Sequence, residues 1–287
     1  MSSNGPNAGR DKELLALLPR RLYRLVSVEA LASPAPWRGE ARAASKQGGQ
    51  ATSSHSRSPR PTPSAAESGG GAFRVLLDGK PMRTPSKRDF AVPGRALAQA
   101  IAGEWSAQGA RIDPRTMPLT TLANTAIDGV SSRELAVRAD IVKYAGSDLL
   151  CYRAQQPEAL VRRQGEAWDG ILDWASEELG VRFAVGKGLM PIPQPAAAPV
   201  AVASALAPLD PFSLAAMHVI TALSGSALLA LAHLRGRLTA EGLWAAAHVD
   251  EFFQISQWGN DAEADARRQR QWAELEAASR MLKLLGS

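Results

Sequence analysis

Cysteine, histidine and nucleotide-binding motifs are scarce or missing in this chain of 287 residues. Cys151 is its one cysteine, so an internal disulfide is impossible and a cysteine-based zinc site, which needs several thiolates, is excluded. The four histidines have no metal-ligand spacing, and neither a phosphate-binding loop nor a nucleophile elbow occurs. We therefore expect no metal site, and Cys151 is predicted to be a small buried hydrophobe.

Long stretches without charged residues are also rare, and one of them has to be considered as a membrane span. Residues 211–234 contain no Asp, Glu, Lys or Arg over a length that could cross a bilayer. The same stretch holds two histidines, three serines and a threonine and is rich in alanine, which is barely hydrophobic. It predicts two buried helices broken near Ser224-Gly225-Ser226 and no stable membrane insertion.

The N-terminal residues 1–19 lack a long apolar run, so a secretory signal is not expected and the segment is predicted to be flexible. Asp11 and Glu13 are unusual for a transit peptide, because such peptides are poor in acidic residues. The bacterial cytoplasm is the expected compartment, with the mitochondrial matrix as the alternative.

The net charge of +5 is concentrated in one segment, residues 33–71, where five basic side chains stand against two acidic ones. The rest of the chain is nearly neutral and has no basic stripe interleaved with aromatics, so nucleic acid is not the expected partner. The segment is rich in Ser, Ala, Gly and Pro and buries too little apolar surface to offset the entropy of ordering. It is predicted to be a disordered insert.

Residues 20–130 predict an N-terminal α+β domain. Alternating residues before the insert and at 73–77 indicate strands, and Asp78-Gly79 indicates a hairpin turn. A helix is predicted from Pro93 to Gly109, where Leu97, Ile101 and Trp105 recur every four residues. A second, shorter helix starts near Pro118.

Residues 131–287 predict an all-α C-terminal domain. Ser131 and Glu134 have the spacing of a capping box. A long helix ending at Gly180 carries one apolar stripe made of Val161, Trp168, Ile171, Leu172, Ala175 and Leu179. Later helices are predicted to be capped at Thr239 and to run from about Asp261 to Leu285.

One helical face near the C-terminus contains an unexpected carboxylate. Steps of four and three residues place five side chains on one face of one predicted helix: Trp244, His248, Glu251, Ile255 and Trp258. Asp250 points about 100° away from Glu251, so the two cannot act as a facing carboxylate pair. The residues leave open whether Glu251 is a solvated edge residue, a contact for a partner's cation, or an acid–base group.

Several sequence blocks together resemble a known family. They occur in this order: "FRVLLDGKPMRTP", "AVPGRALAQAIAGEW", "MPLTTLANTAIDG", "SDLLCYRA", "EAWDGILDWA" and "HVDEFFQISQWG". The chain resembles the assembly chaperones that bind the alpha subunit of the F-type ATP synthase catalytic head. The resemblance implies an N-terminal α+β domain, a helical C-terminal domain, no catalysis and no cofactor. It also implies that the chaperone holds the alpha subunit until the beta subunit replaces it.

The resemblance also suggests site residues. The family's functionally important acidic residue corresponds to Glu251, and the predicted partner-binding residues around it are Asp250, Phe253, Gln254 and Trp258. Three other residues are predicted to be structurally critical: Trp105, Asp148 and Trp168. The protein is expected to be a monomer.

Two other functions remain open from the residues alone. One is a small-molecule enzyme using Glu251 and His248 as acid and base, which needs a pocket containing a third polar group. The other is a nucleic-acid binder that uses the basic insert at 33–71, whose affinity would fall steeply with salt.

Overall fold

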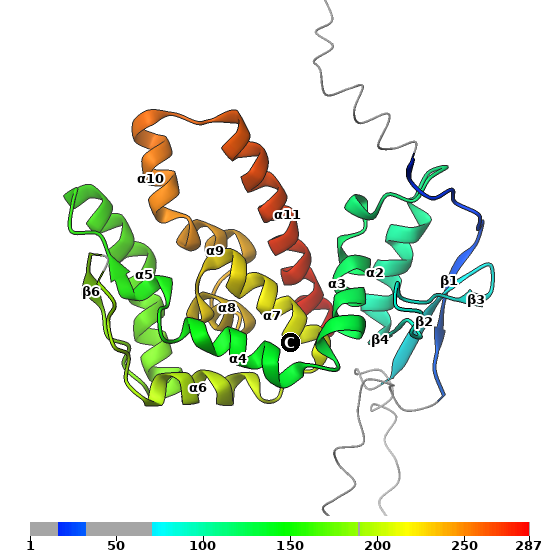
Figure 1. Ribbon diagram of the computed structural model, residues 1–287, viewed down its shortest axis with the longest axis horizontal. Helices are drawn as coiled ribbons and strands as arrows, with labels where there is room; N and C mark the ends of the chain where they lie inside the picture. Colours follow the sequence, from blue (N-terminus) through cyan, green and yellow to red (C-terminus); the bar gives the residue numbers. More distant parts are fainter. Residues whose placement is uncertain (1–16, 33–70, 189, 287) are drawn as a thin grey trace, which may run out of the picture.

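The computed structural model describes residues 17–32, 71–188 and 190–286. The predicted insert at 33–71, apart from Gly71, and most of the predicted flexible N-terminus at 1–19 therefore lie outside the described residues. A small sheet with helices α2 and α3 forms one side of the molecule, and the remaining helices form the other (Figure 1). The α+β fold class predicted from the sequence is confirmed.

The sheet is built around β2 (Ala72–Leu77), which pairs antiparallel with three short strands: β1 (Val26–Ala30), β3 (Lys80–Pro81) and β4 (Ala91–Pro93). The predicted turn joins β2 to β3, with positive φ at both Asp78 (48°) and Gly79 (76°). This is the geometry that a two-residue hairpin favours. The Asp78 carboxylate also accepts hydrogen bonds from the backbone N–H of Arg24 (3.0 Å) and Leu25 (2.7 Å), which ties the turn to the start of β1.

Helix α2 (Arg95–Ser106) packs on this sheet, and α3 (Pro118–Thr125) packs on α2. Helix α3 continues into a π-helical turn, Ala126–Val130. The helix predicted from Pro93 begins two residues later, because Pro93 is still the last residue of β4. Leu97 and Ile101 are fully buried, as their spacing predicts.

Glu104 of α2 caps the next helix, a contact that local sequence patterns do not reveal. Its carboxylate accepts hydrogen bonds from the backbone N–H of Leu119 (2.8 Å) and Thr120 (2.8 Å) and from the Thr120 hydroxyl (2.6 Å). These N–H groups belong to the first turn of α3, where no partner exists within the helix. Glu104 therefore supplies from another helix the acceptor that a local N-cap residue would normally supply.

The change Glu104→Gln should lower the free energy of unfolding by about 1–3 kcal/mol, because one backbone donor would then face an amide NH2 instead of an oxygen. Chemical denaturation followed by circular dichroism measures the loss. Glu276→Gln, on an exposed position of the last helix, is the matched control and should change stability by less than about 0.5 kcal/mol. Equal effects of the two substitutions would contradict the capping role.

The helical side contains eight helices among the described residues. They are α4 (Glu134–Tyr144), α5 (Glu158–Leu179), α6 (Ala197–Leu206), α7 (Pro211–Ser224), α8 (Ala227–Leu234), α9 (Ala240–Ala247), α10 (Val249–Trp258) and α11 (Ala262–Leu285). A short parallel pair, β5 (Tyr152–Arg153) with β6 (Gly186–Lys187), lies among them. The predicted end of α5 at Gly180 is confirmed by its left-handed conformation (φ 66°).

The uncharged stretch forms two buried helices, α7 and α8, as predicted. Gly225 has a positive φ of 68°, and the Ser226 side chain caps α8 by accepting a hydrogen bond from the backbone N–H of Leu229 (2.9 Å). Helix α7 packs against α4, α8 and α11. No helix in the described part of the chain has the length and apolar character that a bilayer crossing requires.

The predicted capping box at Ser131 and Glu134 is wrong. Helix α4 begins at Glu134 after Arg133, and no side chain caps its start. Ser131 instead ends the preceding π-helical turn, where its hydroxyl donates to the carbonyl of Ile127 (2.7 Å) and its N–H donates to Ala126 (2.9 Å). Ser131 therefore belongs to the end of the π-helical turn, and it does not cap α4 as its spacing from Glu134 had predicted.

Helix α11 connects the two sides of the molecule. It packs on α7 and α9 within the helical side and also on α2 and α3 next to the sheet (Figure 1). Leu275, Ala278, Met281 and Leu282 of α11 are buried in a hydrophobic core that extends through both sides. The position of α11 is therefore determined by packing against both sides of the molecule.

Candidate partner-binding surface

The helix predicted to carry Trp244, His248 and Glu251 on one face is broken at His248. Helix α9 ends at Ala247 and α10 starts at Val249, while the His248 backbone (φ −113°, ψ 23°) departs from helical values. The His248 ring stacks on Trp244 with centroids 3.7 Å apart, and its Nδ1 lies 3.0 Å from the Trp244 carbonyl oxygen. The prediction of one continuous helix is therefore wrong.

The environment of His248 disfavours its protonated form. Burial against Trp244 lowers the pKa of the imidazole below its ordinary value, and this effect outweighs its hydrogen bond to the Trp244 carbonyl and the nearby charge of Glu251. Glu251 itself is paired with another side chain. The two residues are thus not arranged as a free acid and base.

Glu251 forms an ion pair with Arg268 of α11. Arg268 Nη1 lies 2.9 Å from Glu251 Oε1, and its Nη2 donates to Asp265 Oδ1 (2.9 Å) and to the side-chain oxygen of Asn260. The Arg268 side chain is 9% exposed and that of Glu251 is 32% exposed. The hydrogen bond to Glu251 raises the pKa of the guanidinium, so Arg268 stays charged. We call these four residues the Arg268 cluster.

Asp250 and Phe253 attach α10 to α5. The Gln164 side-chain amide donates to Asp250 Oδ1 (2.6 Å), and the Gln164 side-chain oxygen accepts from the backbone N–H of Ala154 (2.8 Å). Phe253 is 7% exposed, and the guanidinium of Arg163 lies 5.2 Å from the centre of its ring. Among the predicted partner-binding residues, Phe253 is thus buried inside the protein.

Other residues of α10 are open to solvent. Trp258, its last residue, is 79% exposed, Phe252 is 36% exposed, and Gln254 is exposed as well. A groove of about 400 Å³ adjoins Phe252 between α5, α9 and α10, and its lining is mainly small and apolar: Ala167, Leu238, Gly242, Ala245, Ala246 and Val249, with Arg163 and Glu166 at the edge. We call Asp250, Phe252, Gln254, Trp258 and this groove the α10 surface.

Two of the three residues predicted to be structurally critical are buried among the helices. Asp148 is fully buried, and its carboxylate accepts from the Ser226 hydroxyl (2.6 Å) and from the backbone N–H of Leu228 (3.1 Å) and Leu150 (3.2 Å). Trp168 is 1% exposed and its indole N–H donates to the Ala246 carbonyl (2.7 Å).

The third, Trp105, is half-buried at the end of α2. Its ring centroid lies 5.7 Å from that of Tyr23, and its carbonyl accepts a hydrogen bond from the Tyr23 hydroxyl (2.7 Å). This contact connects α2 to the chain segment that leads into β1.

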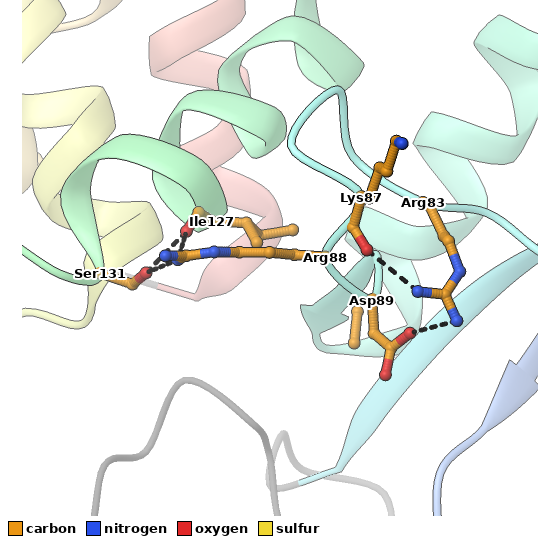
Figure 2. A pocket seen from close by; sticks show the side chains of 7 residues that line it. Arg83, Lys87, Arg88, Asp89, Ile127 and Ser131 are labelled. Carbon is orange, nitrogen blue, oxygen red and sulfur yellow. Dashed lines mark hydrogen bonds and ion pairs between the residues drawn. The ribbon is translucent and has the colours of Figure 1, made fainter.

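A second pocket, of about 420 Å³, lies beside the loop between β3 and β4, and three basic side chains line it: Arg83, Lys87 and Arg88. Figure 2 shows that they diverge: Arg88 reaches the Ile127 carbonyl (2.8 Å) and Ser131, Arg83 reaches Asp89 (3.5 Å), and Lys87 extends elsewhere. The two guanidinium groups thus bind other parts of the protein and hold the loop between β3 and β4 in place. We therefore do not assign this pocket to a ligand.

The described residues contain no group of three or more His, Cys, Asp or Glu side chains that could hold a metal ion. Cys151 is buried, which raises the pKa of its thiol to about 12, so it is not an activated nucleophile. The arrangement of the α10 surface is suited to contacting another protein.

Comparison with known proteins identifies the family of this chain. The ATP12 chaperone protein family matches residues 62–176. The crystal structure of Atp12 from Paracoccus denitrificans is 37% identical over 93% of this chain and 98% of that chain, with a TM-score of 0.76. An Asp-to-Lys mutant of the same protein gives 36% identity over the same shares and the same TM-score.

A third solved structure is Atu1473 from Agrobacterium tumefaciens, described as a candidate chaperone. It is 39% identical over 99% of this chain and 92% of that chain, with a TM-score of 0.78. The chain therefore belongs to the ATP12 chaperone family, the ATP synthase assembly chaperones that its sequence resembles, and it is a chaperone and not an enzyme.

Proposed function

We propose that this chaperone binds the unassembled alpha subunit of the F-type ATP synthase catalytic head through the α10 surface, prevents its aggregation and releases it to the beta subunit. The observation that carries the proposal is Trp258, a large aromatic side chain left 79% exposed at the end of a helix whose other face is packed. Tryptophan is among the residues that most often anchor protein interfaces.

The chemistry of the α10 surface suits an unassembled subunit. Such a subunit exposes an apolar interface, which is an aggregation hazard until a partner covers it. The groove beside Phe252 can accept apolar side chains, and the exposed Asp250 can pair with a cation on the partner. The contact must also be reversible, so a limited surface is preferable to one of maximal affinity.

Co-expression of the alpha subunit with and without this protein tests the proposal. We expect soluble alpha subunit, eluting together with the chaperone in size-exclusion chromatography, only when the chaperone is present. An alpha subunit that stays insoluble in both cases would overturn the proposal. The Paracoccus and Agrobacterium proteins described above come from bacteria, which supports the bacterial cytoplasm as the compartment of action.

Trp258→Ala should weaken binding of the alpha subunit by about 30-fold, because loss of an interface anchor costs about 2 kcal/mol or more. Its effect on folding stability should stay within about 0.5 kcal/mol, since the side chain is exposed. Binding is measured by titration of the alpha subunit, and stability by thermal unfolding.

Leu135→Ala is the matched control for Trp258→Ala. Leu135 is 84% exposed on α4, away from the α10 surface, so its truncation removes exposed apolar area without touching the proposed site. It should leave binding unchanged. Equal affinities for the two variants would place the alpha subunit somewhere else on the chaperone.

A further inference from the structure

The side chain of Glu251 is directed at a charge inside the protein. Its carboxylate is 2.9 Å from Arg268, whose side chain is 9% exposed. A nearly buried guanidinium needs acceptors for its N–H groups, and those of Arg268 come from three different segments of the chain. Glu251 belongs to α10, Asn260 to the turn that follows, and Asp265 to α11.

These polar contacts join two helices that otherwise pack on different parts of the protein. Helix α10 rests on α5, whereas α11 rests on α7, α9, α3 and α2. Figure 1 shows α10 and α11 diverging from the turn that connects them. The direction of the turn relative to α11 therefore depends on the Arg268 cluster.

The turn begins directly after the proposed anchor of the α10 surface. Trp258 is the last residue of α10, and Gly259 then takes a positive φ of 86°. This conformation favours glycine and reverses the chain within a few residues. An anchor at the end of a helix binds tightly only when it is held in its binding orientation, because ordering a mobile side chain on binding costs free energy.

We propose that Glu251 is a positioning residue that acts through Arg268, holding the α10–α11 turn so that Trp258 is presented to the partner. This inference rests on the proposed function. It assigns the negative charge of Glu251 to an internal contact, in contrast to the expectation that Glu251 meets a cation of the partner. Arg268 then becomes a second residue on which binding depends, although its side chain is almost inaccessible.

A double-mutant cycle distinguishes the two roles. The variants are Glu251→Gln, Arg268→Gln and the double variant, and the affinity of each for isolated alpha subunit is measured. If Glu251 acts through Arg268, each single change should weaken binding about 10-fold, and the double variant should be no weaker than either single variant. If Glu251 contacts the partner directly, Glu251→Gln weakens binding by the same factor in both backgrounds, which would overturn the inference.

Hydrogen exchange at residues 259–261 gives a readout that does not depend on the partner. Both single variants should speed exchange there while leaving exchange in the buried helix α7 unchanged. Unchanged exchange at the turn, or unchanged affinity in both single variants, would also overturn the inference. Glu178→Gln breaks the exposed pair with Arg235 on another surface and should alter neither readout.

The outcome is separable from that of the proposed function. A wild-type chaperone that fails to bind the alpha subunit contradicts the proposed function itself. A wild-type chaperone that binds, together with an additive cycle, contradicts only the positioning role of Glu251.

Discussion

Asp148→Ala should lower the free energy of unfolding by about 3 kcal/mol at pH 5, because it leaves several buried donors without an acceptor. Those donors are the Ser226 hydroxyl at 2.6 Å and the backbone N–H of Leu228 at 3.1 Å and of Leu150 at 3.2 Å. They belong to segments about 80 residues apart, so Asp148 joins the turn after α4 to the start of α8. Urea denaturation measures the loss.

Asp140→Ala is the control for Asp148→Ala. Asp140 lies on α4 with its side chain 49% exposed and forms a surface pair with Lys143 (2.6 Å). Its removal should change stability by less than about 1 kcal/mol, as is typical of exposed ion pairs. Similar losses of unfolding free energy for the two variants would show that the buried hydrogen bonds of Asp148 do not stabilise the fold.

The effect of Asp148→Ala should also depend on pH. Burial raises the pKa of the Asp148 carboxyl to about 6, although the hydrogen bonds from Ser226, Leu228 and Leu150 oppose the rise. Between the ordinary value of 3.8 and about 6, the folded protein binds more protons at this site than the unfolded chain. The resulting stability is complete below 3.8 and is lost as the pH rises through about 6. The loss on mutation should be smaller at pH 7 than at pH 5 by about 1 kcal/mol.

Trp168→Ala should destabilise the fold by about 4 kcal/mol, the cost of emptying a large buried aromatic site. The side chain is 1% exposed, its N–H donates to Ala246 in α9, and the guanidinium of Arg153 lies 5.1 Å from its ring centre. It therefore holds α5, α9 and the β5 strand together. Thermal unfolding of the variant checks this value.

Two further variants sharpen the Trp168 result. Trp168→Phe keeps most of the apolar contact but leaves the Ala246 carbonyl without its donor, so it should cost about 1–3 kcal/mol. Trp258→Ala removes an equal side chain from an exposed position and should barely change stability. A Trp168→Ala protein as stable as Trp258→Ala would contradict the packing role.

Features controlled by neighbouring residues could be predicted from the sequence. The Asp78-Gly79 turn, the end of α5 at Gly180, the break near Gly225, the cap at Thr239 and the start of the last helix near Asp261 all follow from local backbone preferences and local hydrogen bonds. The apolar stripe of α5 also predicted burial of Trp168, Ile171 and Ala175. These local preferences did not identify the family. The resemblance to the family rested on the order and spacing of whole sequence blocks.

Other features required the tertiary structure. The Ser131 capping pattern fails because a π-helical turn takes up that residue, and the helix pattern across His248 fails because the chain bends where the imidazole stacks on Trp244. Glu104 of α2 caps α3, and no residue next to the start of α3 in the sequence predicts this contact.

The sequence by itself determined much of the secondary structure of this protein, its α+β class and its family, because each depends on short-range patterns or on their order. It also marked Glu251 as a carboxylate on an otherwise apolar face. Only the tertiary structure decided what that carboxylate contacts. Arg268 lies 17 residues further along the chain, and the two side chains meet because α5 holds α10 while α7, α3 and α2 hold α11. Such a contact depends on the packing of distant segments, and no local preference encodes it.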